Sequence, residues 1–419
     1  MRGEKPYFVD LFAGCGGLSL GLENAGFVPA YVNEIDHSAM ETYLRNRDKK
    51  HPLLREKHSS HDIRKLTHSK NALNRLVSGL EEDYGIRKGD LALVVGGPPC
   101  QGYSAVGIRR TFPMDKKDIP SNYLYRDMIK VIEKLQPKAF LFENVAGLMR
   151  GRWTPDGRSG EIWNDVQKAF TRIGGYNVRW QLIHARSYDV PQNRPRIIMV
   201  GVRDEFKFED DENLTCNGLL PEGKVSPYPK ELGLEWLLSD LVDPNYKKTL
   251  MTPKYLCSPR NDVQKKLRTG SDGKLIKKGD SLTEQEYSKH SKKIVEKFRY
   301  MLDHKGKTLK RMKTKKFAQR VLPKEWNADG PNITATSLPD DYVHYSQPRS
   351  LTVREWARLQ TFPDWYEFSG KRTTGGRRRA GDPSKGDWSR ETPKYTQIGN
   401  AVPVKLAEKI GLHIKSLIS

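Results

Sequence analysis

The sequence has few cysteines and no long apolar segment. Its 419 residues include four cysteines, which lie far apart without a CxxC pair or a cluster with histidine. This spacing predicts neither a disulfide framework nor a zinc site, so we expect no metal. No stretch approaches the roughly 20 apolar residues that span a bilayer, and no apolar signal segment precedes the first predicted strand. We therefore expect a protein of the reducing cytoplasm without membrane association.

Acidic residues are also scarce relative to basic ones. The chain has 51 Asp and Glu residues against 73 Lys and Arg residues, which gives a formal net charge of +22. Such an excess favours a polyanionic partner, and nucleic acid is the first candidate. The alternative is a well-solvated surface, because lysine runs often serve only solubility.

The first 200 residues alternate apolar strand patterns with helical patterns. Strands are predicted at residues 7–12, 29–33, 91–95, 139–142, 176–183 and 197–202, and helices at residues 18–25, 38–46 and 123–135. This alternation predicts an α/β fold with a doubly wound, mostly parallel sheet. From about Asp204 the pattern becomes polar and rich in Pro and Gly, so we expect a second domain there.

Two basic stretches lie in that second region. The first is a run of cations with Phe317 and Trp326 nearby, and it comprises Lys305, Lys307, Lys310, Arg311, Lys313, Lys315 and Lys316. Cations with aromatic neighbours suit phosphate contacts and base stacking, although a solvated helix face gives the same pattern. The second, residues 371–390, reads as a long basic loop.

Cys100 lies directly after a predicted buried strand, residues 91–95, and is preceded by two glycines and two prolines. In open α/β sheets, ligands bind at the carboxyl ends of the strands. The position therefore suits a nucleophile. A buried cysteine that acts only as a small apolar side chain is the alternative.

A glycine-rich turn joins the first predicted strand to the first predicted helix, with Gly14, Gly16 and Gly17 at its centre. Such a turn allows a ligand to approach the backbone closely. Glu34 ends the second predicted strand, where a carboxylate can accept hydrogen bonds from ribose hydroxyls. The pair indicates an adenosine-containing cofactor, unless the glycines serve only a tight turn.

Three charged residues are predicted at the same edge of the sheet. Glu143 follows the strand at residues 139–142, where desolvation would raise its pKa and suit it to act as a general acid. Arg194 and Arg196 precede the strand at residues 197–202, and their guanidinium groups can hold a phosphate, a base carbonyl or the carboxylate. Considered singly, a structural interpretation is favoured for each of them: a salt-bridged Glu143 and a surface pair of arginines.

Five sequence blocks, in this order, resemble the motif series of the carbon-5 cytosine-specific DNA methyltransferases of prokaryotic restriction-modification systems. They are DLFAGCGG from Asp10, GGPPCQGYS from Gly96, ENV from Glu143, QNRPR from Gln192 and YTQIGNAVP from Tyr395. Two weaker blocks, HDI from His61 and a block at residues 349–363, also fit. The region from about Asp204 to Tyr345 has no counterpart in these motifs, and a basic insert at residues 371–390 replaces what is a shorter connection in many relatives.

The resemblance implies a class I S-adenosylmethionine-dependent methyltransferase with a Rossmann-like fold and a smaller target-recognition domain. We expect a large domain at residues 1–203, the recognition domain at 204–394, and a C-terminal segment at 395–419 that returns to the large domain. In such enzymes the cysteine, here Cys100, adds to carbon 6 of a flipped cytosine and so activates carbon 5. The glutamate, here Glu143, contacts ring nitrogen 3, while Arg196, with Arg194 beside it, helps to hold the base and the catalytic loop.

The resemblance also assigns binding residues. The residues expected to contact S-adenosylmethionine and its product S-adenosylhomocysteine are Phe12, Ala13, Gly14, Gly16, Gly17, Leu18, Glu34, Ile35, Asp62, Ile63, Pro98, Asn400 and Val402. The residues expected to contact double-stranded DNA are Gln101, Ser104, Lys310, Arg311, Lys313, Lys315 and Lys316. No metal is expected.

Two alternatives remain open at this point. One branch of the family methylates tRNA, although it typically lacks a large recognition region, and some relatives are inactive DNA-binding regulators. For the DNA methyltransferase, we expect a monomer in the cytoplasm of a prokaryotic cell, associated with the nucleoid. A restriction endonuclease that acts on the same sequence without a stable complex is the expected functional partner.

Overall fold

The computed structural model describes residues 5–99, 117, 119–208, 219–220, 233–312, 320–322, 342–373 and 391–419. Within these residues, seven strands form one sheet in the order β3-β2-β1-β4-β5-β7-β6. The strands are β1 (Tyr7–Leu11), β2 (Val28–Asn33), β3 (Ser59–Ser60), β4 (Leu93–Gly96), β5 (Ala139–Val145), β6 (Tyr176–His184) and β7 (Pro195–Arg203). The doubly wound α/β fold predicted from the sequence is confirmed.

The sheet is parallel except at one strand. β1 pairs in parallel with β2 and β4, and β4 pairs in parallel with β5. β7, which lies between β5 and β6, runs antiparallel to both. Because of this reversal, β7 begins at the edge of the sheet where the parallel strands end.

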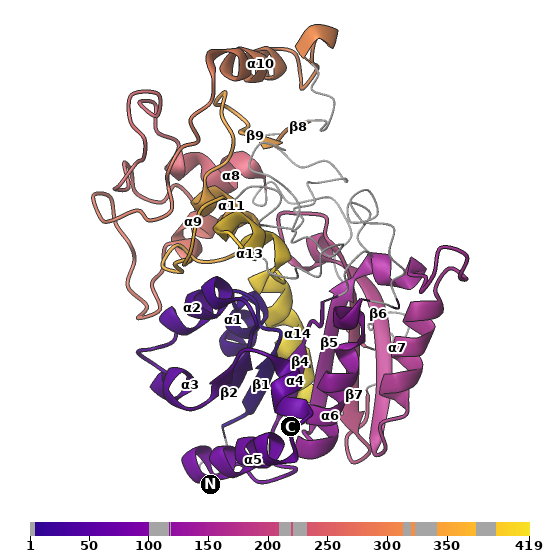
Figure 1. Cartoon of the computed structure of the whole chain (residues 1–419). Coiled ribbons are helices and arrows are strands. Elements are labelled where there is room, and N and C mark those ends of the chain that lie inside the picture. Colours follow the sequence, from indigo (N-terminus) through magenta and orange to yellow (C-terminus); the bar gives the residue numbers. More distant parts are fainter. Residues whose placement is uncertain are drawn as a thin grey trace.

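Helices cover both faces of the sheet (Figure 1). One face packs against α1 (Gly17–Asn24) and α14 (Val404–Leu417), and the other against α5 (Lys70–Tyr84), α6 (Tyr125–Leu135) and α7 (Glu161–Thr171). Adjacent residues of the central strands point to opposite cores, as with Phe8 and Val9. A strand that is buried on both faces must be apolar throughout, which explains the continuous apolar runs in the sequence.

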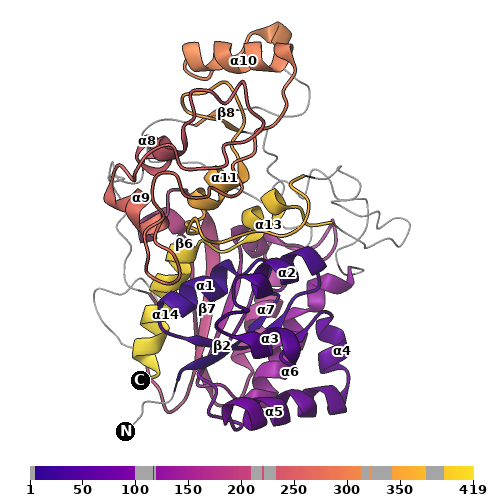
Figure 2. The same ribbon diagram turned by 90° about the vertical axis from the view of Figure 1, so that its left-hand side faces the viewer.

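The C-terminal helix α14 lies beside α1, as Figure 2 shows. A Cβ atom at Gly21 of α1 would overlap the side chain of Ala407, and one at Gly411 would lie 2.9 Å from the Cβ of Ala25. Glycines on both helices therefore allow this close crossing. The last residues of the chain are thereby held against the first helix.

The remaining elements lie near the sheet edges or in the region after β7. Around the sheet are α2 (His37–Arg45), α3 (Pro52–Glu56), α4 (Ile63–Thr67) and the 3-10 turns η2 (Pro120–Tyr123), η3 (Ala146–Arg150) and η4 (Ala185–Tyr188). The region after β7 contains α8 (Leu234–Leu238), η6 (Ser239–Leu241), α9 (Asp262–Leu267), α10 (Lys292–Asp303), η7 (Lys310–Met312), β8 (Arg320–Val321), β9 (Tyr342–Val343), α11 (Val353–Leu359) and α13 (Lys394–Asn400). α8, α9 and α11 share an apolar core with residues of α1 and α13. No helix in the described part of the chain is long and apolar enough to cross a membrane.

Candidate functional site

The sequence blocks meet at the carboxyl edge of the parallel strands. β1 leads into the glycine-rich turn, β4 leads into Gly97 and Pro98, and β5 ends with the block that starts at Glu143. The antiparallel pairing of β5 and β7 sets Val145 opposite Arg196, so the arginine block lies at this edge as well. This is the edge at which ligands bind in open α/β sheets.

The turn at residues 12–17, which we call the glycine turn, has the backbone shape that its glycines predict. Phe12, Gly14 and Gly16 all have positive φ angles, of 60°, 57° and 84°. A Cβ atom at Gly14 would meet nothing within 4 Å. The turn therefore presents open space beside Gly14, as a loop that receives a ligand must.

Gly17 is the first residue of α1. Unlike Gly14, it lacks open space beside it, because other parts of the chain pack against it. A Cβ atom there would overlap the carbonyl oxygen of Val402 and lie 3.1 Å from the Cβ of Ala401. The late block of the sequence is thus in backbone contact with the glycine turn. Leu18 is buried in the core, whereas Asn400 is exposed next to this contact.

Glu34 lies beside the turn with its carboxylate held by two backbone amides. The N–H of Gly14 donates to Oε2 and the N–H of Asp36 donates to Oε1, each at 2.8 Å. Each oxygen keeps a lone pair for a further donor, such as a ribose hydroxyl. Burial raises the pKa of Glu34 to about 6, and the two amides act against that rise.

The ends of β2 and β3 are held together beside Glu34, next to the predicted residue Ile35. The side-chain amide of Asn33 donates to the carbonyls of Ser60 and His61, each at 3.1 Å, and so aligns the two strand ends. Ile35 is 64% exposed, so its apolar side chain is accessible for contact with a flat ligand ring.

Asp62 and Ile63, the predicted adenine contacts, both make structural contacts within the protein. Asp62 caps α4 by accepting from the backbone N–H of Arg64 at 3.0 Å, and it also pairs with the guanidinium of Arg64. The hydrogen bond from the Arg64 guanidinium lowers the pKa of Asp62. Ile63 is buried in the core.

Asp10, near the end of β1, is buried behind the turn, and the sequence predicts no role for it. Ser19 of α1 donates to Oδ2 of Asp10, and the Ser19 and Tyr43 hydroxyl oxygens are 2.9 Å apart. Burial raises the pKa of Asp10 to about 7, and the Ser19 hydroxyl acts against that rise. A buried carboxyl group of this kind titrates near neutral pH.

The charged residues predicted at the strand ends form a buried pair. Arg196 Nε lies 2.6 Å from Glu143 Oε1, and both side chains are nearly inaccessible to solvent. Burial lowers the pKa of Arg196, and the neighbouring Glu143 acts against that fall. The neighbouring Asn144 donates its amide to the carbonyl of Pro98 at 3.0 Å, which fixes the loop that leads to Cys100.

Arg194 lies at the same edge but contacts the backbone of another block. Its Nη2 donates to the carbonyl of Gly399 at 2.6 Å and to that of Asn400 at 3.4 Å. Burial lowers the pKa of Arg194 well below its usual value, and repulsion from Arg196 adds to the effect. The contact joins the QNRPR block to the end of α13.

Several predicted residues fall outside the described part of the chain. These are Cys100, Gln101, Ser104, Lys313, Lys315 and Lys316, together with residues 374–390 of the basic insert. Lys310 and Arg311 are exposed in η7, which follows α10. In Figure 1, α10 lies at the opposite end of the molecule from the two chain termini.

The sequence patterns missed two residues that contact the glycine turn, Arg47 and Tyr366. Arg47 Nη2 donates to the carbonyl of Gly16 at 3.3 Å, and the Tyr366 hydroxyl donates to the carbonyl of Cys15 at 2.6 Å. Tyr366 comes shortly after the quoted block at residues 349–363, but an isolated tyrosine or arginine carries no signal of such a contact. Their partners lie more than 30 residues away in the chain.

Comparison with known proteins agrees with the motif series. A family model described as C-5 cytosine-specific DNA methylase matches residues 7–416. The Type II methyltransferase M.DdeI of Desulfomicrobium norvegicum is 30% identical over 422 residues, which cover 97% of this chain and 88% of that protein. M.Sau96I of Staphylococcus aureus is 30% identical over 427 residues, which cover 100% of this chain and 77% of that protein.

Solved structures share the fold. A prophage-encoded DNA modification methyltransferase of E. coli superposes with a TM-score of 0.65 at 23% identity, over 98% of this chain and 99% of that chain. The Dnmt2 methyltransferase of S. pombe superposes with a TM-score of 0.56 at 17% identity, over 98% and 99% of the two chains. The sheet described above is therefore that of known methyltransferases.

Proposed function

The chain belongs to the C-5 cytosine-specific DNA methylase family, and on that premise we propose that it methylates carbon 5 of a flipped cytosine in duplex DNA through a covalent Cys100 intermediate. One observation supports this most. The Glu143–Arg196 pair and the Glu34 carboxylate beside the glycine turn lie at the same edge of the sheet. The first suits a reacting base, and the second suits an adenosine cofactor.

The residues around the turn fit S-adenosylmethionine, which would supply the methyl group. Glu34 would accept hydrogen bonds from the ribose hydroxyls with the lone pairs that Gly14 and Asp36 leave free. The exposed side chain of Ile35 would pack against the adenine. The open space beside Gly14 would receive the amino-acid part of the cofactor.

Cys100 would act as the nucleophile on the target base. Its thiolate would form a bond to carbon 6 of cytosine, and the ring electrons would move to carbon 5, which then takes the methyl group. Loss of the proton from carbon 5 and expulsion of the Cys100 thiolate would restore the aromatic ring. The loop before Cys100 is fixed by the hydrogen bond from Asn144 to Pro98.

Glu143 would act as a general acid: its carboxyl group would donate a proton to ring nitrogen 3 and so neutralise the negative charge that develops there as the thiolate adds. Arg196 would hold the Glu143 side chain in position, because it lies 2.6 Å away in a buried pair. Arg194 would contribute indirectly, since it fixes the backbone at Gly399 and Asn400. Asp62, Ile63, Pro98 and Val402 would complete the cofactor site.

Double-stranded DNA would bind across this edge and the region after β7. Carbon 6 is inaccessible within a stacked duplex, so the target cytosine must be flipped out at a cost of a few kcal/mol. Gln101 and Ser104 would contact the strand from which the base came. The cations from Lys310 to Lys316 would contact phosphates, in keeping with the net charge of +22.

The biological setting follows from the relatives, which are named Type II methyltransferases. We infer a cytoplasmic, monomeric modification enzyme of a prokaryotic restriction-modification system, whose endonuclease partner shares the target sequence. The recognition domain would comprise residues 204–394, and the cofactor domain residues 1–203 with 395–419.

A methyl-transfer assay distinguishes this function from the alternatives. The protein is incubated with methyl-labelled S-adenosylmethionine and either duplex DNA or bulk tRNA, in separate reactions. We expect label in DNA alone, and bisulfite sequencing of that DNA should then give the target sequence. Label confined to tRNA would contradict the proposal, and label in neither substrate would favour an inactive DNA-binding protein.

A further inference from the structure

Tyr366 connects the region after β7 to the glycine turn. The residue is fully buried, and its hydroxyl group lies between the turn and Arg47 of the segment that follows α2. The hydroxyl donates to the carbonyl oxygen of Cys15 at 2.6 Å and accepts from Arg47 Nη1 at 3.0 Å. A Cβ atom at Gly16 would lie 2.8 Å from this same hydroxyl, so the turn is packed directly against it.

Arg47 holds the next carbonyl of the turn. Its Nη2 donates to Gly16 O at 3.3 Å, its Nε donates to Glu23 at 2.7 Å, and its guanidinium lies 3.9 Å above the ring of Tyr43. The carbonyl groups of Cys15 and Gly16 are thus both bound on the inner side of the turn. Because the C=O and N–H of a trans peptide unit point in opposite directions in one plane, the N–H of Gly17 points away from Arg47.

Tyr366 is itself fixed by residues far from the turn. Arg354 of α11 donates to the carbonyls of Pro363 and Tyr366, at 3.1 Å and 2.9 Å. The backbone N–H of Asp364 donates to Leu267 O at 2.7 Å. The short segment at residues 363–366 is therefore positioned by α9 and α11.

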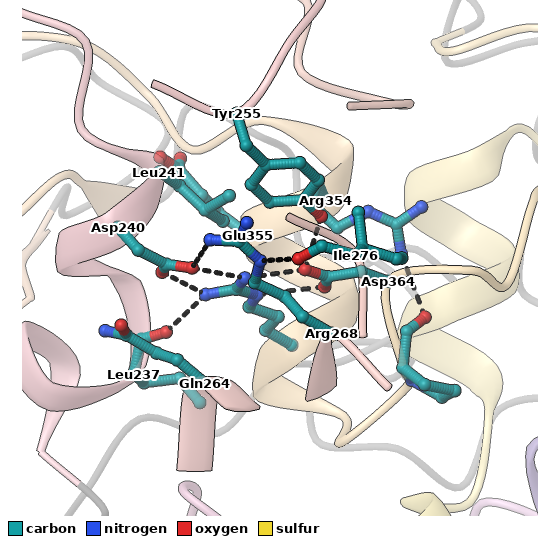
Figure 3. Close-up of polar contacts among 12 residues, drawn as sticks. Leu237, Asp240, Leu241, Tyr255, Gln264, Arg268, Ile276, Arg354, Glu355 and Asp364 are labelled. Atoms are coloured by element: carbon teal, nitrogen blue, oxygen red, sulfur yellow. Dashed lines mark hydrogen bonds and ion pairs between the residues drawn. The ribbon is translucent and has the colours of Figure 1, made fainter. Parts of the chain in front are cut away.

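A buried ion cluster, formed by Asp240, Arg268, Arg358 and Asp364, fixes the same segment (Figure 3). Arg358 lies 2.6 Å from both Asp240 and Asp364, and all four side chains are inaccessible to solvent. The hydroxyl of Tyr255 also donates to Asp364, at 2.6 Å. Burial alone would raise the pKa of Asp364, but Arg358 holds it below its usual value.

A continuous series of polar contacts thus runs from residues 240–268 through Asp364 and Tyr366 to the glycine turn. We propose that Tyr366 is a positioning residue that holds the glycine turn in its cofactor-binding shape. The proposal rests on the function proposed above, in which this turn binds S-adenosylmethionine. Loss of the hydroxyl would leave the Cys15 carbonyl without this donor, and the turn would have to be ordered when the cofactor binds.

The variant Tyr366→Phe removes only the hydroxyl, and Tyr176→Phe is its matched control. Both hydroxyls donate to a backbone carbonyl at 2.6 Å, but Tyr176, on β6, donates to Pro137 rather than to the turn. Both variants should unfold at a lower urea concentration than the wild type. Only Tyr366→Phe should lose affinity for the cofactor.

The measurements are the Kd of S-adenosylmethionine by titration calorimetry, and KM and kcat on duplex DNA. For Tyr366→Phe we expect Kd and KM for the cofactor to rise about tenfold, which equals ~1.4 kcal/mol, with kcat at saturating cofactor and KM for DNA nearly unchanged. For Tyr176→Phe we expect wild-type values of all four quantities.

Three outcomes would overturn the proposal, and they are distinguishable. Equal cofactor affinity in the wild type and Tyr366→Phe would show that the hydroxyl does not position the turn. An equal loss in both variants would show a general structural effect. A wild-type protein that does not bind S-adenosylmethionine at all would refute the proposed function itself, and this proposal with it.

Discussion

The buried carboxyl group of Glu34 makes cofactor binding depend on pH. Its pKa is raised to about 6 by burial, so the side chain takes up a proton just below neutral pH. Ribose hydroxyls donate to the charged form, and a protonated carboxyl group offers fewer acceptor sites. Affinity for S-adenosylmethionine should therefore be nearly complete about one pH unit above 6 and should fall as the pH is lowered through 6.

The size of the effect follows from the pKa. One unit below the pKa, about one molecule in ten keeps the charged carboxylate, so Kd at pH 5 should be about tenfold higher than at pH 8. This ratio corresponds to ~1.4 kcal/mol. Glu34→Gln cannot titrate, so its weaker affinity should stay nearly constant over the same range.

Titration calorimetry of wild type and Glu34→Gln at pH 5, 6, 7 and 8 measures both curves, with circular dichroism to show that each protein stays folded. A wild-type Kd that does not change between pH 8 and pH 5 would refute the reasoning. So would an equal pH slope in Glu34→Gln, because another group would then be responsible.

Three further predictions concern stability, each measured as the free energy of unfolding in urea. Burial raises the pKa of Asp10 from 3.8 to about 7, so the stability that its protonated form contributes should be lost as the pH rises from about 4 through 7. In Asp10→Asn the free energy of unfolding should decline less over this pH range. An equal decline in wild type and variant would show that another group is responsible. Asp240→Asn leaves two buried arginines short of a partner and should lower the free energy of unfolding by about 3 kcal/mol. Asp272→Asn, at an exposed pair, should leave it nearly unchanged. Similar losses in both would show that burial of the cluster is unimportant. Gly17→Ala should lower the free energy of unfolding by about 1–3 kcal/mol, because its Cβ would overlap the carbonyl oxygen of Val402. Gly174→Ala should leave it nearly unchanged, because a Cβ there meets nothing within 4 Å. An unchanged stability of Gly17→Ala would contradict the close contact.

The sequence predicts the central strands well because each of them is buried on both faces. The continuous apolar run at residues 139–142 predicts a buried strand, and it forms the first part of β5. The reversed direction of β7 was not predicted, since a buried strand has the same apolar pattern in either direction. That reversal explains why Arg196, at the start of its strand, lies beside Glu143, near the end of another.

The candidate site could be predicted only where its residues follow strands. Glu34 and Glu143 each end or follow an apolar run, so local pattern places them at the carboxyl edge. Arg47 and Tyr366 reach the glycine turn from segments that are about 30 and 350 residues away. Such contacts depend on tertiary packing, which a single sequence does not encode in any local pattern.

The central claim is that Cys100 carries out methyl transfer to carbon 5 of cytosine in DNA. Its most direct test is mass-spectrometric quantification of 5-methyl-2′-deoxycytidine in duplex DNA that has been treated with S-adenosylmethionine and either wild type or Cys100→Ser. We expect the modified nucleoside with wild type alone, while Cys100→Ser still binds the cofactor. Comparable amounts from both proteins, or none from wild type, would contradict the account.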